Sequence, residues 1–478
     1  MAEIKDIKEL LGNIDTDEIL KLSLSGGGQF SELFFENKSF SSVILEDGKI
    51  EEIVGGIDRG IGLRVINDGK TFFAHTNSFE NKNLIELASG ISSAISSDRY
   101  GTDLTKSFAI KKEEHAKSLT PDFIKASLDA KVEKLKEAES FLPLGDKSLR
   151  HYRLVFSDSV QDVAIINSLD GEATDKRANS IFLVHLVVSD GELIQTGYEP
   201  VGGSEGFAMF NNINLRDVVG KAYERAMLIL KAPKAPGGTM PVVLSSEAGG
   251  TMIHEAVGHG FEADYAQEGL SVYSHKKGEL IASPLVTVAD DPTLPGKRGT
   301  YRVDDEGTKP GHNVLIEKGV LKNYLYDRLS SWKDNVHSTG NGRRESYKCK
   351  PIPRMSNTFI KSGTHDPKEI LSSTDSGLFV RKMGGGQVNP VNGDFIFEVS
   401  EGYLISGGKI TTPVRGATLA GNGPKVLLEI DMVGNDLGFG IGTCGKDSQG
   451  VPVSDAQPTL RIKSIVVGGE ASPQPKNQ

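Results

Sequence analysis

Apolar and polar residues alternate along several runs between residues 30 and 76. Such alternation is typical of half-buried antiparallel strands. Asp-Gly pairs at 47–48 and 68–69 separate the runs, and this dipeptide is a strong signal for a two-residue hairpin turn. The pattern therefore predicts a series of antiparallel strands, followed by a helix over 81–97, where the apolar residues change to helical spacing.

Helical spacing also indicates structure at the start of the chain and in its second quarter. The first 20 residues carry charges at short intervals and lack the apolar core of a secretory signal, so we expect one amphipathic helix there. A long helix is predicted from Thr120, which can cap it, with Pro121 at its first position. Strand-like runs return between residues 151 and 200.

The best domain boundary is the stretch KAPKAPGGTMP at 231–241, which contains three prolines and two glycines. It follows a predicted helix over 216–232. Beyond it, one helical segment is followed by short β-type runs that Gly-rich turns interrupt. We predict an α+β protein, with an N-terminal α/β domain of antiparallel strands at 1–236 and a C-terminal β-barrel-like domain at 237–478 that carries the helical segment.

Composition excludes some partners. The 478-residue chain has a formal net charge of -10, whereas nucleic-acid affinity comes from clustered Lys and Arg, so we expect no nucleic-acid partner. No run reaches the roughly 18 apolar residues that span a bilayer, so we expect a cytoplasmic protein without a membrane partner. The two cysteines, Cys349 and Cys444, do not make a disulfide framework, and each is a candidate ligand, nucleophile or buried thiol.

The segment TMIHEAVGHGFEAD, residues 251–264, carries candidate metal chemistry. His254 and Glu255 begin like the His-Glu-x-x-His motif of zinc peptidases, but His259 follows His254 by five positions instead of four. In a regular α-helix, positions i and i+5 lie roughly 140° apart. A single π-type turn would bring the two imidazoles to one side, and the glycines on both sides of His259 permit such a turn.

This spacing allows a catalytic zinc site. Such a site takes three protein ligands and leaves the fourth position to water. His254 and His259 can supply two of the ligands, and Glu255 can accept the proton of the water. The alternative interpretation is a pair of ordinary helix histidines.

The third ligand is left open by the spacing, because four side chains are candidates: Glu262 and Asp264 just downstream, Cys349, and Cys444. Each also has a structural interpretation. The two acidic residues would suit a solvated face, and Cys444 would suit a buried thiol in a tight glycine loop.

Five ordered segments, spread over nearly the whole chain, carry further motifs: RGIGLRVI, HEAVGHGFEAD, GNGRRESY, GGGQVNPVNGDFIF and GTCGKDSQGVPVSDAQPTLRI. In these segments the chain resembles the TldD/PmbA family, and within it the TldD-type metallopeptidase subunit. The resemblance implies an N-terminal α/β domain and a C-terminal barrel-like domain that holds one Zn²⁺ ion. It places the ligands on His254, His259 and Cys444, and the general base on Glu255.

The same family contains a companion subunit of TldE/PmbA type that lacks the zinc motif. Because this chain keeps all of the motif residues, it resembles the catalytic partner. The resemblance implies a dimer, either a homodimer or a heterodimer with a zinc-free subunit of that type. Cys349 departs from the family pattern, and its neighbours Lys348 and Lys350 would favour a reactive thiolate or a rival metal ligand.

The function expected from these observations is zinc-dependent hydrolysis of small or unfolded peptides. A peptide could add as a strand to the β-rich C-terminal half, and Arg343 and Arg344 are candidate donors to the oxyanion. The alternative function is a non-catalytic peptide-binding or chaperone-like module with a structural zinc, to which Glu262 or Cys349 would add a fourth ligand. Gyrase modulation through DNA contact, suggested by an older name of the family, fits poorly with the negative charge.

Overall fold

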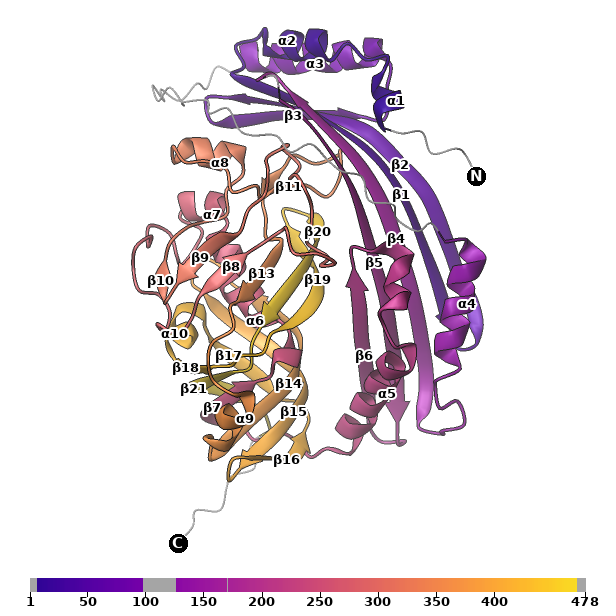
Figure 1. Ribbon diagram of the computed structural model, residues 1–478, viewed down its shortest axis with the longest axis vertical. Helices are drawn as coiled ribbons and strands as arrows, with labels where there is room; N and C mark the ends of the chain where they lie inside the picture. Colours follow the sequence, from indigo (N-terminus) through magenta and orange to yellow (C-terminus); the bar gives the residue numbers. More distant parts are fainter. Residues whose placement is uncertain (1–6, 98–125, 170, 471–478) are drawn as a thin grey trace.

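The computed structural model describes residues 7–97, 126–169 and 171–470. One long, curved antiparallel sheet forms one side of the molecule, and a β-rich unit lies against its concave face (Figure 1). The predicted α+β class is confirmed, with antiparallel strands in the N-terminal half and a β-barrel in the C-terminal half.

The N-terminal sheet has six strands in the order β3-β2-β1-β4-β5-β6. Its strands are β1 (Phe30–Glu46), β2 (Lys49–Asn67), β3 (Lys70–Thr76), β4 (Leu149–Asn167), β5 (Gly171–Ser189) and β6 (Ile194–Gly203). Both predicted Asp-Gly turns are present. Asp47 and Gly48 have φ values of 45° and 85°, the left-handed conformation that a two-residue hairpin turn requires.

Helices cover both ends of this sheet. The helices predicted over 81–97 and 216–232 are confirmed as α3 (Asn81–Ser97) and α5 (Leu215–Lys231). The single helix expected at the start is wrong, because the described part contains α1 (Ile7–Leu11) and α2 (Thr16–Leu24). The Asp15 side chain accepts a hydrogen bond from the Glu18 amide and so begins a second helix.

In the described residues, the helix predicted from Thr120 begins later in the chain than predicted. Thr120 and Pro121 lie outside the described residues, and α4 spans Leu128–Glu139. Ser127 caps this helix by accepting a hydrogen bond from the Ala130 amide, so the helix begins there.

A closed five-stranded barrel forms the lower part of the C-terminal unit (Figure 1). The order β14-β7-β21-β17-β15 returns to β14 through a β14–β15 pairing, which closes the ring. The barrel strands are β7 (Gly238–Leu244), β14 (Ser376–Val388), β15 (Asp394–Ser406), β17 (Thr418–Asn422) and β21 (Leu460–Gly468), with β16 (Lys409–Val414) and β18 (Ile430–Val433) at its side. Because β7 opens the barrel, we keep the division between 1–236 and 237–478 as a proposal.

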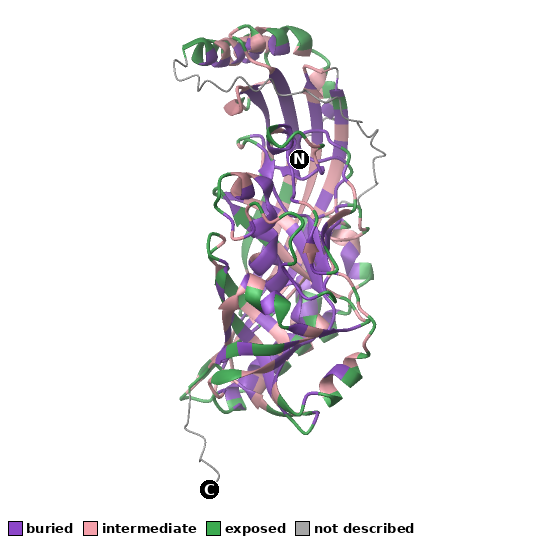
Figure 2. Ribbon diagram, turned by 90° about the vertical axis from the view of Figure 1, so that its left-hand side faces the viewer, coloured by how far each residue is buried: buried purple, intermediate pink, exposed green. Residues whose placement is uncertain are grey.

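A second sheet in the C-terminal unit has the order β10-β9-β8-β13-β20-β19. Its strands are β8 (Val288–Asp290), β9 (Asn313–Glu317), β10 (Val320–Leu321), β13 (Asn357–Ile360), β19 (Gly438–Lys446) and β20 (Gln449–Gln457). Short elements complete the unit: α6 (Thr251–Ile253), α7 (Ala263–Gln267), α8 (Arg328–Lys333), α9 (Pro367–Ser372), α10 (Gly423–Leu428), β11 (Gly342–Arg343) and β12 (Ile352–Pro353). The largest apolar core lies between barrel and sheet, where buried residues concentrate in Figure 2.

Buried charges join the N-terminal sheet to the C-terminal unit. Arg64 on β2 donates to Glu32 on β1 at 3.1 Å and to Glu306 at 2.6 Å. Arg344 donates to the other oxygen of Glu32 at 2.6 Å. All four side chains are at most 3% exposed. These four residues, the interface ion network, bring the motifs RGIGLRVI and GNGRRESY together.

No helix in the described part of the chain is long and apolar enough to cross a membrane.

Candidate metal centre

The π-type turn predicted from the histidine spacing is present. A π-helical turn spans His254–Gly258, between α6 and a short 3-10 turn over His259–Phe261. The two imidazole rings lie 5.2 Å apart, nearly perpendicular to one another. A side chain at Gly258 would collide with Met355, which explains the glycine at the end of the turn. The extra residue in the motif is thus absorbed locally, and both histidines share one side.

Cys444 joins the two histidines from a distant strand. It lies on β19, and its Sγ is 3.6 Å from Nε2 of His259. The ligand atoms of His254, His259 and Cys444 all lie within 4.8 Å of one another. Within the described residues, this is the one such group of three or more histidine, cysteine or acidic side chains.

Two carboxylates orient the imidazoles. Nδ1 of His254 lies 2.7 Å from Asp455 on β20, and Nδ1 of His259 lies 3.1 Å from Glu262. A histidine that donates from Nδ1 to a carboxylate presents its Nε2 lone pair, as metal-binding histidines commonly do. In both rings, Nε2 is therefore the nitrogen that can bind a metal ion.

Sequence analysis missed these two orienting residues. Nothing in the local sequence pointed to Asp455, which is 201 positions from its histidine. Glu262 was considered as a ligand or as part of a solvated face, and the second interpretation is wrong because the side chain is fully buried. Its carboxylate lies 3.1 Å from Lys446 Nζ and 3.8 Å from Arg354 Nε. These cations keep the pKa of Glu262 low, at about 2, against the opposing effect of burial.

The three donors stabilise one another as a thiolate between two imidazolium rings. Burial opposes the thiolate of Cys444, but His254 and His259 outweigh it and lower its pKa to about 5. Burial likewise opposes the charged form of His259, yet Glu262 and the thiolate raise its pKa to about 10. Burial also opposes the charged form of His254, and Asp455 and the thiolate raise its pKa. A divalent cation would replace the two ring protons.

The donor set suits zinc. Two imidazole nitrogens and one thiolate are ligand types that zinc prefers, and three protein ligands leave one tetrahedral position open. Neither Glu262 nor Cys349 belongs to the cluster. A fourth protein ligand, as a structural zinc site requires, is not found within the described residues.

Glu255 stands beside this cluster with a free carboxylate. It is partly exposed, and it makes no hydrogen bond or ion pair within the part of the chain that the structure describes. Burial is the main cause that raises the pKa of Glu255, so this carboxylate titrates closer to neutral pH than an ordinary glutamate does.

Other residues considered from the sequence have structural contacts. Asp264 pairs with Lys446 at 2.7 Å. Arg343 donates to the backbone carbonyls of Met355 and Pro452, and Arg344 belongs to the interface ion network.

The expectation of a reactive thiolate at Cys349 is wrong. Burial raises the pKa of this thiol. Its neighbour Lys348 does not act on the thiol, because its ammonium pairs with Asp58 at 2.8 Å.

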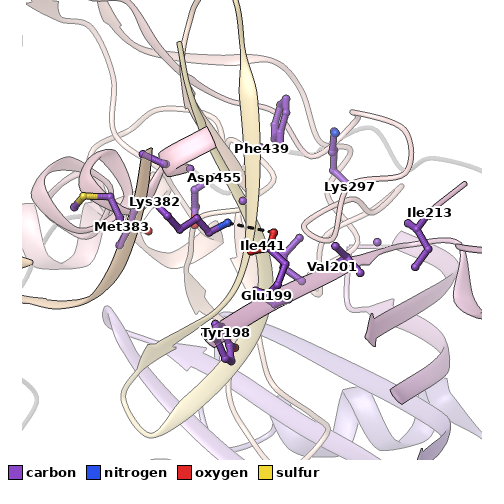
Figure 3. A pocket seen from close by; sticks show the side chains of 18 of the residues that line it. Tyr198, Glu199, Val201, Ile213, Lys297, Lys382, Met383, Phe439, Ile441 and Asp455 are labelled. Atoms are coloured by element: carbon purple, nitrogen blue, oxygen red, sulfur yellow. Dashed lines mark ion pairs between the residues drawn. The ribbon is translucent and has the colours of Figure 1, made fainter. Parts of the chain in front are cut away.

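A cleft of about 820 Å³ opens next to the cluster (Figure 3). Its lining comes from both units of the molecule: 198–203 on β6, 249–251 before the π-helical turn, 295–297, 382–385 on β14 and 439–441 on β19. Asp455 lines the cleft and also contacts His254. Through Asp455 the cleft adjoins His254, although His254, Glu255, His259 and Cys444 are not themselves part of its lining.

Comparison with known proteins decides the family. Residues 237–469 match the PmbA/TldA metallopeptidase C-terminal domain, 31–97 match domain 1, and 121–230 match the central domain. The chain belongs to the PmbA/TldD family. The chain is a metalloprotease, as are the TldD homologs that it resembles. The metalloprotease TldD homolog of Haemophilus influenzae is 36% identical over 449 residues, which cover 92% of this chain and 93% of that protein.

Further proteins are similar to this chain in sequence or in fold. The zinc metalloprotease TldD homolog of Saccharolobus solfataricus is 26% identical, over 93% of this chain and 97% of its own. TldE from Thermococcus kodakarensis has a TM-score of 0.75 at 19% identity, and the match covers 95% of this chain and 99% of that protein. A Thermotoga maritima protein, described as a candidate modulator of a DNA gyrase, has a TM-score of 0.78 at 21% identity, over 96% and 100%. These two structures show the fold alone.

Proposed function

We propose that the chain is a zinc-dependent peptidase of small or unfolded peptides. His254, His259 and Cys444 would hold the Zn²⁺ ion, and Glu255 would act as general base. A zinc ion bound there supplies a Lewis acid and lowers the pKa of a water ligand. The observation that carries the proposal is the convergence of three donors beside an unpaired carboxylate and an open cleft.

The residues around the ligands support this chemistry. Asp455 and Glu262 fix the two imidazoles, so that Nε2 faces the thiolate of Cys444. Glu255 has no partner to release before it accepts a proton from water and delivers it to the leaving amine. The alternative, a peptide-binding module with a structural zinc, would need a fourth protein ligand.

The cleft suits an extended peptide. β14 pairs with β7 only as far as Val380, so the segment 382–385 presents a backbone edge to the cleft. A peptide added to this edge would be held by backbone hydrogen bonds, with little dependence on its side chains. Small or unfolded chains can present such a backbone, whereas folded proteins cannot.

The test is cleavage of an unfolded peptide by the zinc-loaded chain, with and without a chelator. We expect Glu255→Gln to lower the turnover rate by about 10²–10⁴-fold, while the zinc content, measured by mass spectrometry of the metal, stays near that of the wild type. Glu268→Gln, at an exposed position just after α7, is the matched control and should cleave normally. Full activity of Glu255→Gln would remove the assigned base, and activity that the chelator leaves intact would remove the metal.

We also propose that the chain works as a dimer, with a second copy or with a zinc-free TldE/PmbA-type subunit. In the described residues, the outer edge of β2 over 49–60 pairs with no strand, because β3 covers only its C-terminal part. Ile53, Val54 and Ile57 on this edge are 48%, 39% and 42% exposed. An exposed apolar edge readily pairs with another chain. Light scattering should give a dimer mass that Ile57→Lys lowers to a monomer; an unchanged mass would refute this interface.

A further inference from the structure

A chain of alternating charges starts at the side of the cleft that β6 and β14 form, where Glu199 and Lys382 are part of the lining, and continues through residues outside the lining. Nζ of Lys382 lies 3.9 Å from Glu199, the ion pair drawn in Figure 3. Arg225 donates to the other oxygen of Glu199 at 2.7 Å and to Glu401 at 3.0 Å. Arg381 donates to the second oxygen of Glu401 at 3.2 Å. These five residues, the cleft charge chain, contain three cations and only two carboxylates.

The excess positive charge lies at Lys382. Both arginines hold a carboxylate at hydrogen-bond distance, whereas 3.9 Å is too long for a hydrogen bond. The ammonium donates no hydrogen bond to any described residue. Burial lowers the pKa of Lys382, Glu199 opposes this effect and Arg225 adds to it, and the weaker effects of Glu247 and Lys221 have opposite signs.

The lysine is accessible from the cleft. Its side chain is 23% exposed and is part of the lining. The other lysine of the lining, Lys297, lies 4.1 Å from the ring centre of Phe439. Glu205 and Glu398 also line the cleft. The cleft as a whole is therefore no site for a polyanion, and the uncompensated charge suits one small anionic group.

We propose that Lys382 binds a carboxylate of the peptide substrate. This inference rests on the proposed peptidase function. A third carboxylate would balance the cleft charge chain and accept charge-assisted hydrogen bonds from the ammonium, which has donors to spare. The C-terminal carboxylate of a short peptide is one source, and an Asp or Glu side chain is the other. Because Asp455, which contacts His254, lines the same cleft, a peptide anchored at Lys382 could extend along the cleft toward the metal centre.

Binding can be measured without cleavage in a zinc-loaded Glu255→Gln background. Fluorescence anisotropy would compare one uncharged peptide as the free acid, as the C-terminal amide, and as the amide with a single internal Glu. We expect the free acid to bind about tenfold more tightly than the plain amide, as for one charge-assisted hydrogen bond. Tight binding of the Glu-containing amide would identify a side chain as the source.

Variants then assign the effect to Lys382. Lys382→Gln should reduce the ratio of acid to amide affinity to about one, and Lys382→Arg should keep most of it. Lys322→Gln, which removes an exposed lysine 3.5 Å from Glu317, is the matched control and should leave the ratio unchanged. Equal binding of all three peptides, no binding of any, or an unchanged ratio in Lys382→Gln would each overturn the inference. Failure of the proposed function would instead appear as no cleavage of any peptide by the zinc-loaded wild type.

Discussion

Two buried clusters of charge in this molecule differ in how their charges are balanced. In the interface ion network, Arg64 and Arg344 face Glu32 and Glu306 at 2.6 to 3.1 Å, so that each charge meets an opposite charge of the chain. At the candidate metal centre, two Nε2 atoms and one Sγ, all potential donors to a metal, gather within 4.8 Å.

The difference separates a structural role from a chemical one. Side chains that satisfy one another join two units of a fold, but they have nothing left with which to bind a ligand. The imidazolium rings and the thiolate of the metal centre also pair with one another, but the same three atoms are metal ligands, so a cation from outside can take the place of the two ring protons. The orientation of the rings reinforces this conclusion, because Asp455 and Glu262 occupy the Nδ1 atoms and leave Nε2 available. Burial alone would not have told the two clusters apart.

The strongest test of the comparison is Arg64→Met. It leaves Glu32 and Glu306 without their shared cation, and we expect the free energy of unfolding to fall by about 3–5 kcal/mol. Zinc content of the folded protein should not change. Arg153→Met, which removes an exposed arginine 3.7 Å from Glu46, is the control and should cost at most about 1 kcal/mol. Urea unfolding measures both, and equal losses would contradict a structural role for the network.

The second test acts on the metal centre. Asp455→Ala leaves His254 without the carboxylate on Nδ1, so zinc affinity should fall by about 10–100-fold. Asp291→Ala is the matched control, because Asp291 faces Nδ1 of His312 at 2.9 Å in a similar pair outside the cluster. Competition with a chromophoric chelator measures the affinity. If Asp455→Ala held zinc as tightly as the control, the carboxylate would not orient the ligand.

The smallest effect concerns the pH dependence of the interface ion network. Burial is the largest cause that raises the pKa of Glu306, to about 7 from an ordinary 4.5, and Arg64 opposes it. The folded state therefore holds this proton more tightly than the unfolded state. This proton therefore contributes to the free energy of unfolding. The contribution is complete below pH 4.5 and is lost as the pH rises through 7, so the free energy of unfolding falls by about 1 kcal/mol between pH 6 and pH 8.

Glu306→Gln cannot titrate and should lack that loss. Urea unfolding at pH 6 and pH 8, compared between wild type and variant, isolates the contribution of this carboxyl. The same change with pH in both proteins would show that Glu306 does not titrate in this window.

Much of the architecture could be predicted because its signals are local. The Asp-Gly turns fix two hairpins, and helical spacing locates α3 and α5. The π-type turn followed from the five-residue spacing of His254 and His259 with glycine on both sides. The start of α4 was predicted wrongly, because Thr120 and Pro121 match a helix start in sequence, whereas in the structure the side chain of Ser127 caps the helix.

Local sequence signals account for only part of the site. The sequence by itself determined the alternating N-terminal strands, the helices α3 and α5, the two histidines and the glutamate between them, because these depend on neighbours within a few positions. Only the tertiary structure decided that Cys444 approaches His259 across 185 positions, that Asp455 reaches His254, and that Glu262 orients a ligand instead of being one. The first two contacts come from β19 and β20, which pair with one another and bring Cys444 and Asp455 to the histidines, and such long-range packing leaves no periodicity in the sequence.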